Sequence, residues 1–196
     1  MIYKIELIQG PIRARMCGFG EKDRRPIDPP PIIKLILPDE TNVKKEFNKL
    51  QSFIVHCDLY SDPDTKCSNI KGNNQQNVRN LVGSLVASPQ LLLDENDQYG
   101  IFFLFLDLSV RTEGKFLLKF TLFCINDSVE ATPATQSLFS NMFDVFPPKR
   151  FPGMTDSTNL SKAFAKQGVK IAIRKSERGS INQGYQDTIE EEEEGS

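Results

Sequence analysis

The sequence predicts an all-β fold, an antiparallel β-sandwich with one or two short helices. Several segments alternate apolar and polar residues, prolines and glycines separate them, and only two segments have helical spacing. The chain has 196 residues, the length of one large domain, and 39% of them are hydrophobic. That composition is sufficient for a packed core.

Eight short strands are expected along the chain. Segments 53–60 and 116–126 place their apolar residues on one face, so each should cover the core with one side. Segment 100–108 is apolar almost throughout, as expected of a strand that is buried on both faces. The full set of expected strands is 5–8, 32–37, 53–60, 81–87, 100–108, 116–126, 138–146 and 169–174.

Two segments are predicted to be helical. The first begins at Ser157 or Thr158, either of which can cap it, and Gly168 supplies its C-terminal stop. The second covers residues 44–50. Both are short, so they do not change the predicted fold class.

Two polar segments are expected to lie outside the core. Residues 61–77 are rich in Asn and Gln and should form a surface loop. From Ser176 onward the composition predicts a disordered tail that ends in a glutamate run. The expected organisation is a folded domain over residues 1–178 and an acidic tail over 179–196.

The formal net charge of −2 is unevenly distributed. Residues 187–196 carry six acids and no base, so residues 1–186 carry 24 basic against 20 acidic side chains, a balance of +4. Residues 149–178 alone hold eight bases and two acids. A basic excess concentrated in one stretch indicates a polyanionic partner.

Several classes of protein are disfavoured. There is no apolar run long enough to span a membrane, and Lys4 and Glu6 interrupt the stretch that an export signal needs. The four cysteines lack the spacing of a zinc site and are expected to be reduced. His56, the single histidine, has no nucleophile motif around it, and nucleotide-binding fingerprints are absent. We therefore expect no enzyme activity, cofactor or metal.

Two basic clusters are candidates for binding DNA. The first combines two glycines with five bases within thirteen residues, and Pro26 and a triple proline follow it; the bases are Arg13, Arg15, Lys22, Arg24 and Arg25. Arginine forks match phosphate oxygens or a guanine edge, and rigid flanking prolines lower the entropic cost of binding. The second cluster is Lys149 and Arg150. Solvated loop charges, partly paired with Glu21 and Asp23, remain an alternative interpretation.

Three ordered blocks of sequence are long and unusual. They are residues 8–20 with 23–31, residues 100–103 with 107–114, and residues 149–154 with 157–158 and 164–171. These blocks resemble the velvet domain of fungal transcriptional regulators. The resemblance implies an immunoglobulin-like β-sandwich, akin to the Rel-homology fold, that reads double-stranded DNA through loops at one end.

The resemblance also implies a biological role and partners. Velvet proteins govern fungal development, sporulation and secondary metabolism, act as homodimers or as heterodimers with another velvet protein, and move between cytoplasm and nucleus. Some bind a methyltransferase-like regulator. The family's DNA-binding cluster corresponds here to Lys22, Arg24 and Arg25, with Gly20 at a position where some members have a further lysine. The alternative is a subunit that dimerises with another velvet protein and contributes little DNA binding itself.

Overall fold

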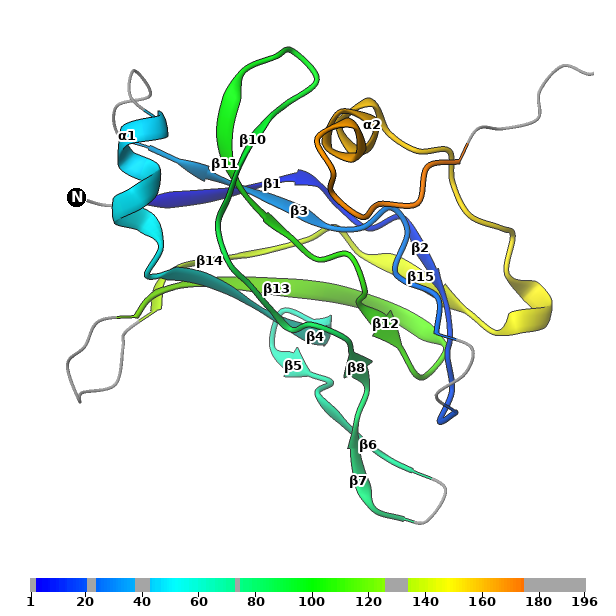
Figure 1. Ribbon diagram of the computed structural model, residues 1–196. Coiled ribbons are helices and arrows are strands. Elements are labelled where there is room, and N and C mark those ends of the chain that lie inside the picture. The colour runs from blue at the N-terminus through cyan, green and yellow to red at the C-terminus, as the bar shows by residue number, and fades with distance from the viewer. Residues whose placement is uncertain (1–2, 21–23, 38–42, 73–74, 126–133, 175–196) are drawn as a thin grey trace, which may run out of the picture.

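The computed structural model describes residues 3–20, 24–37, 43–72, 75–125 and 134–174. Its main feature is a sandwich of two β-sheets that lie face to face (Figure 1). The first sheet has the strand order β1-β3-β11-β10, and each neighbouring pair runs antiparallel. Its strands are β1 (Lys4–Gln9), β3 (Ile32–Ile36), β10 (Gln90–Leu93) and β11 (Tyr99–Leu104).

The second sheet has the strand order β2-β15-β13-β4-β5, with β14 also paired to β13 and β9 to β4. Its strands are β2 (Arg13–Arg15), β4 (Phe53–Asp62), β5 (Thr65–Lys66), β9 (Val86–Ala87), β13 (Gly114–Cys124), β14 (Ala134–Phe139) and β15 (Phe143–Phe146). Among the strand pairs that the structure describes, β2 and β15 run parallel, which departs from the predicted antiparallel sandwich. The parallel pair arises because the chain crosses from β1 in the first sheet to the edge of the second.

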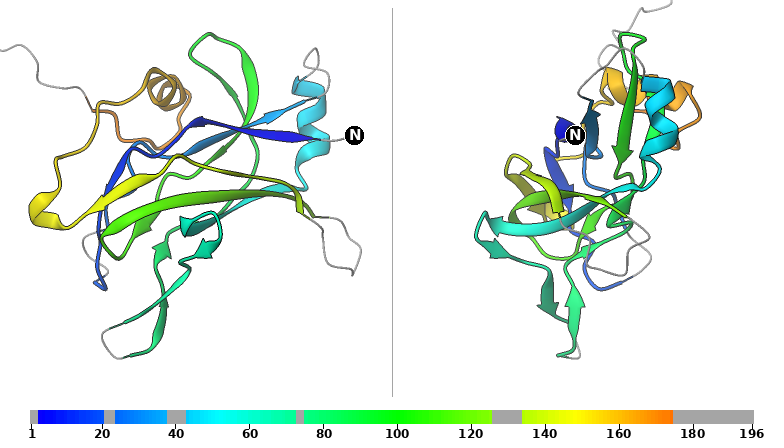
Figure 2. Two further views of the ribbon diagram at one scale, coloured as in Figure 1. Left: turned by 180° about the vertical axis from the view of Figure 1, so that it is seen from behind. Right: turned by 90° about the vertical axis from the view of Figure 1, so that its left-hand side faces the viewer.

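Short helices and two small sheets complete the described part of the chain (Figure 2). The helices are α1 (Val43–Phe47), which continues into the 3-10 turn η2 (Asn48–Leu50), and α2 (Asn159–Lys166). A further 3-10 turn, η3, covers Pro148–Arg150. The small sheets pair β6 (Asn69–Lys71) with β7 (Asn77–Arg79), and β8 (Leu81–Val82) with β12 (Ser109–Val110).

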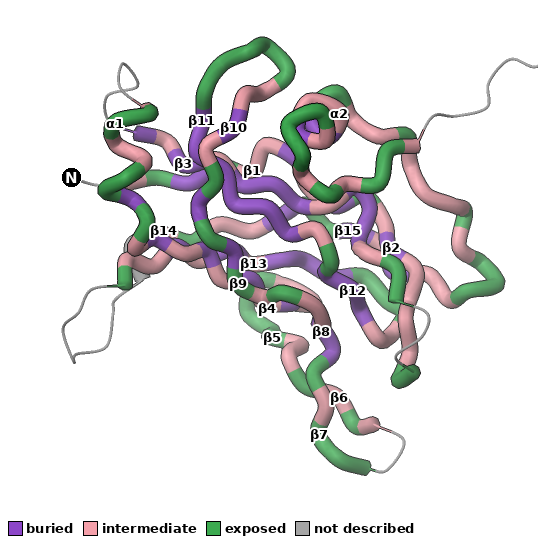
Figure 3. Tube along the Cα trace, in the orientation of Figure 1, coloured by how far each residue is buried: buried purple, intermediate pink, exposed green. Residues whose placement is uncertain are grey.

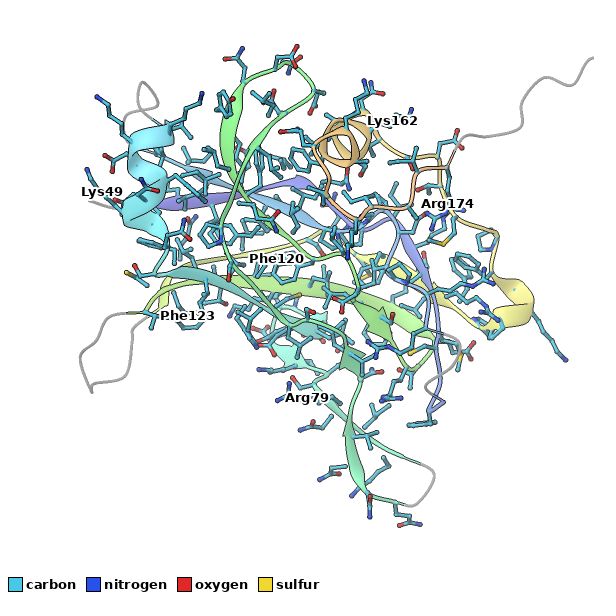
Figure 4. All side chains as sticks on the ribbon, viewed as in Figure 1. Lys49, Arg79, Phe120, Phe123, Lys162 and Arg174 are labelled. Carbon is cyan, nitrogen blue, oxygen red and sulfur yellow. The ribbon has the colours of Figure 1, made fainter. Side chains whose placement is uncertain are left out.

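The core lies between the two large sheets (Figure 3). In the second sheet, Leu59 of β4 is opposite Leu118 of β13, and Cys57 is opposite Phe120. These four side chains are buried, and Phe120 projects between the layers (Figure 4). The inward faces predicted for segments 53–60 and 116–126 are thus confirmed, and so is the all-β sandwich with short helices.

Strand β11 is buried on both faces, as its apolar sequence predicted. Phe103 belongs to the core between the sheets, whereas Phe102 packs on the outer face against Phe164 of α2. The ring centroids of Phe102 and Phe164 are 4.8 Å apart. Helix α2 therefore forms a partial third layer over the first sheet.

Side-chain hydrogen bonds fix helix α2 to β1. The Thr158 Oγ1 caps the helix by accepting from the Ser161 backbone N–H at 3.0 Å, and Thr158 also donates to the Gln9 Oε1. The buried Gln9 amide donates to the Ser161 Oγ at 3.1 Å. Of the two predicted caps, Thr158 is thus correct, and Gly168, at φ +91°, provides the expected stop. Segment 44–50 is helical as predicted.

Several predicted strands are wrong, wholly or in part. Segment 81–87 contains two separate strands, β8 and β9, which belong to different sheets. Segment 138–146 belongs to two strands, β14 and β15, which both pair with β13. Between them, the Ser140 Oγ accepts from the Leu118 N–H of β13 at 2.9 Å and interrupts the backbone pairing with β13. Segment 169–174 has no assigned strand. Its Val169 and Ile171 pack instead against the cluster beneath α2.

Other differences concern short strands. The polar segment 61–77, predicted as a loop, contains β5, β6 and the start of β7. Strands β2 and β10 were missed, and segment 100–108 leaves its sheet after Leu104. The predicted domain boundary at residue 178 and the acidic tail lie outside the described residues.

All four cysteines lie in described segments, and none of them forms a disulfide. Cys57 is buried, while Cys17, Cys67 and Cys124 are half-buried. In the described residues, no helix is both long and apolar enough to span a membrane.

We expect Phe164→Ala to lower the free energy of unfolding by about 3–5 kcal/mol, because it leaves a cavity opposite Phe102. Urea denaturation followed by circular dichroism measures this change. Lys166→Ala on the exposed side of the same helix is the control and should change stability by less than about 0.5 kcal/mol. Equal stability of both variants would show that α2 does not depend on this contact.

Candidate nucleic-acid interface

The parallel pair of β2 and β15 brings the two basic clusters to one end of the sandwich. Arg13 is aligned with Asp144 and Arg15 with Phe146. Because parallel strands end at the same edge, the chain after Arg15 and the turn that carries Lys149 and Arg150 leave the sheet together (Figure 1). Sequence alone separates these clusters by more than 120 positions.

The loop after β2 is anchored at both of its ends by residues 108–111. On its first side, the Cys17 and Gly18 N–H groups donate to the carbonyls of Val110 and Arg111 at 2.9 and 3.1 Å. On its second side, the Ile27 N–H donates to the Leu108 carbonyl at 2.7 Å. Ser109 Oγ also donates to the Arg25 carbonyl at 2.8 Å. Between these anchors lies a short segment, residues 19–26, which we call the basic arm because of the basic side chains in its sequence.

The residues of the first predicted cluster differ in how far they are exposed. Arg24 and Arg25 are exposed and lie just before Ile27, the second anchor, while Lys22 lies outside the described residues. Arg13 and Arg15 are half-buried on β2. Among the described residues of this cluster, Arg24 and Arg25 are therefore the more exposed ones.

Both members of the second predicted cluster, Lys149 and Arg150, are exposed, but Arg150 has an acidic partner. Arg150 Nη2 lies 2.8 Å from the Glu113 Oε2, and both side chains are more than half exposed. A surface pair of this kind contributes at most about 1 kcal/mol, so a phosphate can replace the carboxylate at little cost. Lys149 is exposed on the same turn.

Arg111 is the main residue of this end that sequence reasoning missed. Its Nη1 donates to the Gly18 carbonyl at 2.8 Å, and its Nε donates to the Arg79 carbonyl at 2.9 Å. Its guanidinium also lies 5.9 Å from the ring centroid of Phe19. Arg111 thus joins the basic arm to the β6–β7 hairpin. No local pattern reveals these contacts, because the bonded residues are 93 and 32 positions away along the chain.

Outside the basic end, two ionisable side chains of β4, Cys57 and His56, have well-defined surroundings. Burial raises the pKa of the Cys57 thiol well above its usual value, and the charge of Asp58 acts in the same direction. His56 Nδ1 lies 3.5 Å from the Asp58 Oδ2, which Lys66 also contacts at 2.8 Å. Over the described ranges, no group of three or more His, Cys, Asp or Glu side chains could hold a metal ion.

Together, the fold and this end define a β-sandwich domain that presents basic loops and turns on one side. The family model "Velvet factor" matches residues 3–77 and 63–178. The chain therefore belongs to the velvet family, as its sequence blocks predicted.

Relatives are found in several fungi. The chain is 38% identical to the sexual development regulator VELC of Pyricularia oryzae over 180 residues, 88% of this chain and 41% of the relative. It is 39% identical to the spore development regulator RYP2 of Ajellomyces capsulatus over 183 residues, 90% of this chain and 44% of that protein. It is 30% identical to a velvet complex subunit of Emericella nidulans, covering 99% of this chain and 83% of the relative. The chain thus spans less than half the length of the first two.

We expect Arg111→Lys to lower the free energy of unfolding by about 1–3 kcal/mol, because a lysine keeps the charge but lacks the two separate, rigidly spaced donors, Nε and Nη1, that bond the two carbonyls. Chemical denaturation measures the loss. The matched control is Arg79→Lys, since Arg79 supplies only its carbonyl to the contact. If both variants unfold alike, Arg111 does not hold the arm and the hairpin together.

We expect Cys57 to react with iodoacetamide far more slowly than Cys67 at pH 8. The Cys57 thiol is buried, and its raised pKa keeps it protonated, whereas the thiolate is the reactive form. Mass spectrometry of tryptic peptides measures both rates. In urea the two rates should converge, and equal rates in the folded protein would contradict the assigned burial.

Proposed function

We propose that this chain is a sequence-specific DNA-binding regulator of fungal development. It acts as a homodimer or as a heterodimer with another velvet protein. The observation that supports DNA binding is the anchored basic arm, with Arg24 and Arg25 exposed beside its second anchor. The developmental role is supported by the names of relatives, which include sexual and spore development regulators.

The anchored arm is suited to bind a duplex for a physical reason. Its backbone is held at Gly18 and Ile27 before any ligand arrives, and these two fixed positions lower the conformational entropy that is lost on binding. Lys22, Arg24 and Arg25 are the primary contacts of this proposal. Their charges supply affinity through phosphate groups, and one or two arginine forks discriminate between bases.

The remaining basic residues of this end have secondary roles. Arg15 and Lys149 leave neighbouring strands at the same edge and can extend the phosphate contacts along one strand of the duplex. Arg150 adds a further phosphate contact when a phosphate replaces the Glu113 carboxylate as its partner. Arg13 is less available, because it lies beside Asp144 in the sheet.

The proposal extends to cellular context on the basis of family membership. It includes control of sporulation and secondary metabolism, and location in both nucleus and cytoplasm. It also includes a methyltransferase-like regulator as a further partner.

A second candidate function is a subunit that dimerises with another velvet protein and adds little DNA affinity. The modest balance of +4 over residues 1–186 favours it, and one relative is named as a member of a velvet complex. Gel shifts with this chain alone and with a mixed dimer separate the two candidates. DNA binding only by the mixed dimer would favour the second.

We expect Arg24→Ala/Arg25→Ala to weaken DNA binding and to lower the salt slope of log K by about 0.9 for each phosphate that is no longer bound. The probe is a duplex selected by the wild-type chain from random DNA, with binding followed by fluorescence anisotropy at several salt concentrations. Lys45→Ala/Lys166→Ala removes the same charge from two helices away from this end. Undiminished binding by the arginine variant would remove the primary contacts from the proposal.

A further inference from the structure

The β6–β7 hairpin projects from the sandwich beside the basic arm (Figures 1 and 2). Its strands are in register, with Asn69 opposite Arg79 and Lys71 opposite Asn77. Residues two apart on a strand share a face, so these four side chains form one polar face. All four are exposed, whereas Ile70 and Val78 on the other face are partly buried.

The chemistry of that face matches a nucleic acid. It carries two bases and two amides, and the sequence holds no acidic residue between Asp64 and Asp94. Side-chain amides pair with adenine in the major groove, and lysine and arginine contact phosphates. No acidic side chain within residues 65–93 therefore neutralises the positive charge of this face.

The base of the hairpin is rigidly attached. The Asn80 N–H donates to the Ser68 carbonyl at 2.9 Å and closes the two strands. The Asn80 side chain is buried, and its Oδ1 accepts from the Thr112 N–H at 3.2 Å and from the Thr112 Oγ1 at 3.1 Å. The Arg111 N–H donates to the Asn80 carbonyl at 2.9 Å.

The same short segment positions the basic arm. Arg111 contacts Gly18 with its side chain and accepts from the Gly18 N–H with its carbonyl. It also donates to the Arg79 carbonyl at the base of the hairpin, where Figure 4 labels Arg79. The arm and the hairpin therefore start from one rigid junction at residues 110–112 and have a fixed relative orientation.

From these contacts we infer that the β6–β7 hairpin is a second DNA-reading element, a two-stranded ribbon that enters the major groove next to the phosphates bound by the arm. The inference rests on the proposed DNA-binding function and adds a specificity-determining surface to it. The major groove is about 12 Å wide and admits a two-stranded ribbon. In this arrangement Lys71 and Arg79 bind phosphates, Asn69 and Asn77 read base edges, and Arg111 is the positioning residue.

Two double variants of the full-length chain test the inference. Lys71→Gln/Arg79→Gln removes the charges but keeps the Arg79 carbonyl that Arg111 needs. Asn69→Ala/Asn77→Ala removes the amides. The control is Lys45→Gln/Lys166→Gln, which removes the same charge from helices away from the hairpin. Circular dichroism and thermal unfolding verify that each variant is folded.

The probes are a duplex selected from random DNA by the wild-type chain and a scrambled duplex of equal length, with affinity measured by fluorescence anisotropy at several salt concentrations. The charge variant should bind both duplexes more weakly, with a salt slope lower by about 1.8 because two phosphates are no longer bound. The amide variant should keep the slope, and its preference for the selected duplex should fall about fivefold or more.

Different failures have different meanings. If both hairpin variants behave like the control while Arg24→Ala/Arg25→Ala loses binding, the hairpin inference is wrong and the proposed function stands. If the hairpin variants lose dimerisation but keep wild-type DNA affinity and preference, the face binds protein and the inference is likewise overturned. If the wild-type chain and its velvet dimers bind no duplex, the proposed function itself fails.

Discussion

The basic end of this protein depends on backbone pairing between residues 108–111 and both ends of the loop that follows β2. Hydrogen bonds from Cys17, Gly18 and Ile27 attach that loop to a segment that is itself paired with β8. Backbone bonds of this kind are directional and independent of salt, so they hold the arm in place whatever charges surround it. The exposed side chains of Arg24 and Arg25 extend from this backbone framework.

The sandwich explains why the framework is stiff. Strand β11 is buried on both faces, by the opposite sheet through Phe103 and by α2 through Phe102, and it pairs with β3. The chain then turns at Phe105, whose N–H donates to the Pro31 carbonyl at 3.0 Å, and enters residues 108–111 directly. Only Leu106 and Asp107 thus separate the buried end of this strand segment from the buried residues that anchor the arm.

Features determined by local periodicity could be predicted from the sequence. The faces of β4 and β13, the double burial of β11 and the cap at Thr158 each depend on residues within a few positions of one another. Predictions were wrong where the pattern is short or polar. Strand β2 has three residues and two of them are charged, and the β6–β7 hairpin is rich in amides, a composition also typical of loops. Segment 169–174 alternates like a strand, but its apolar side chains pack beside α2 without a strand partner.

The sequence by itself determined the all-β class, the family and the identity of the basic residues, because alternation and ordered motifs are properties of neighbouring positions. Only the tertiary structure decided which of these residues lie close to one another. It placed Arg15 beside the turn of Lys149 through a parallel strand pair, and it joined Gly18 to Arg79 through Arg111. Such contacts connect residues that are tens to more than a hundred positions apart, and their formation depends on the packing of both sheets, which no local pattern encodes.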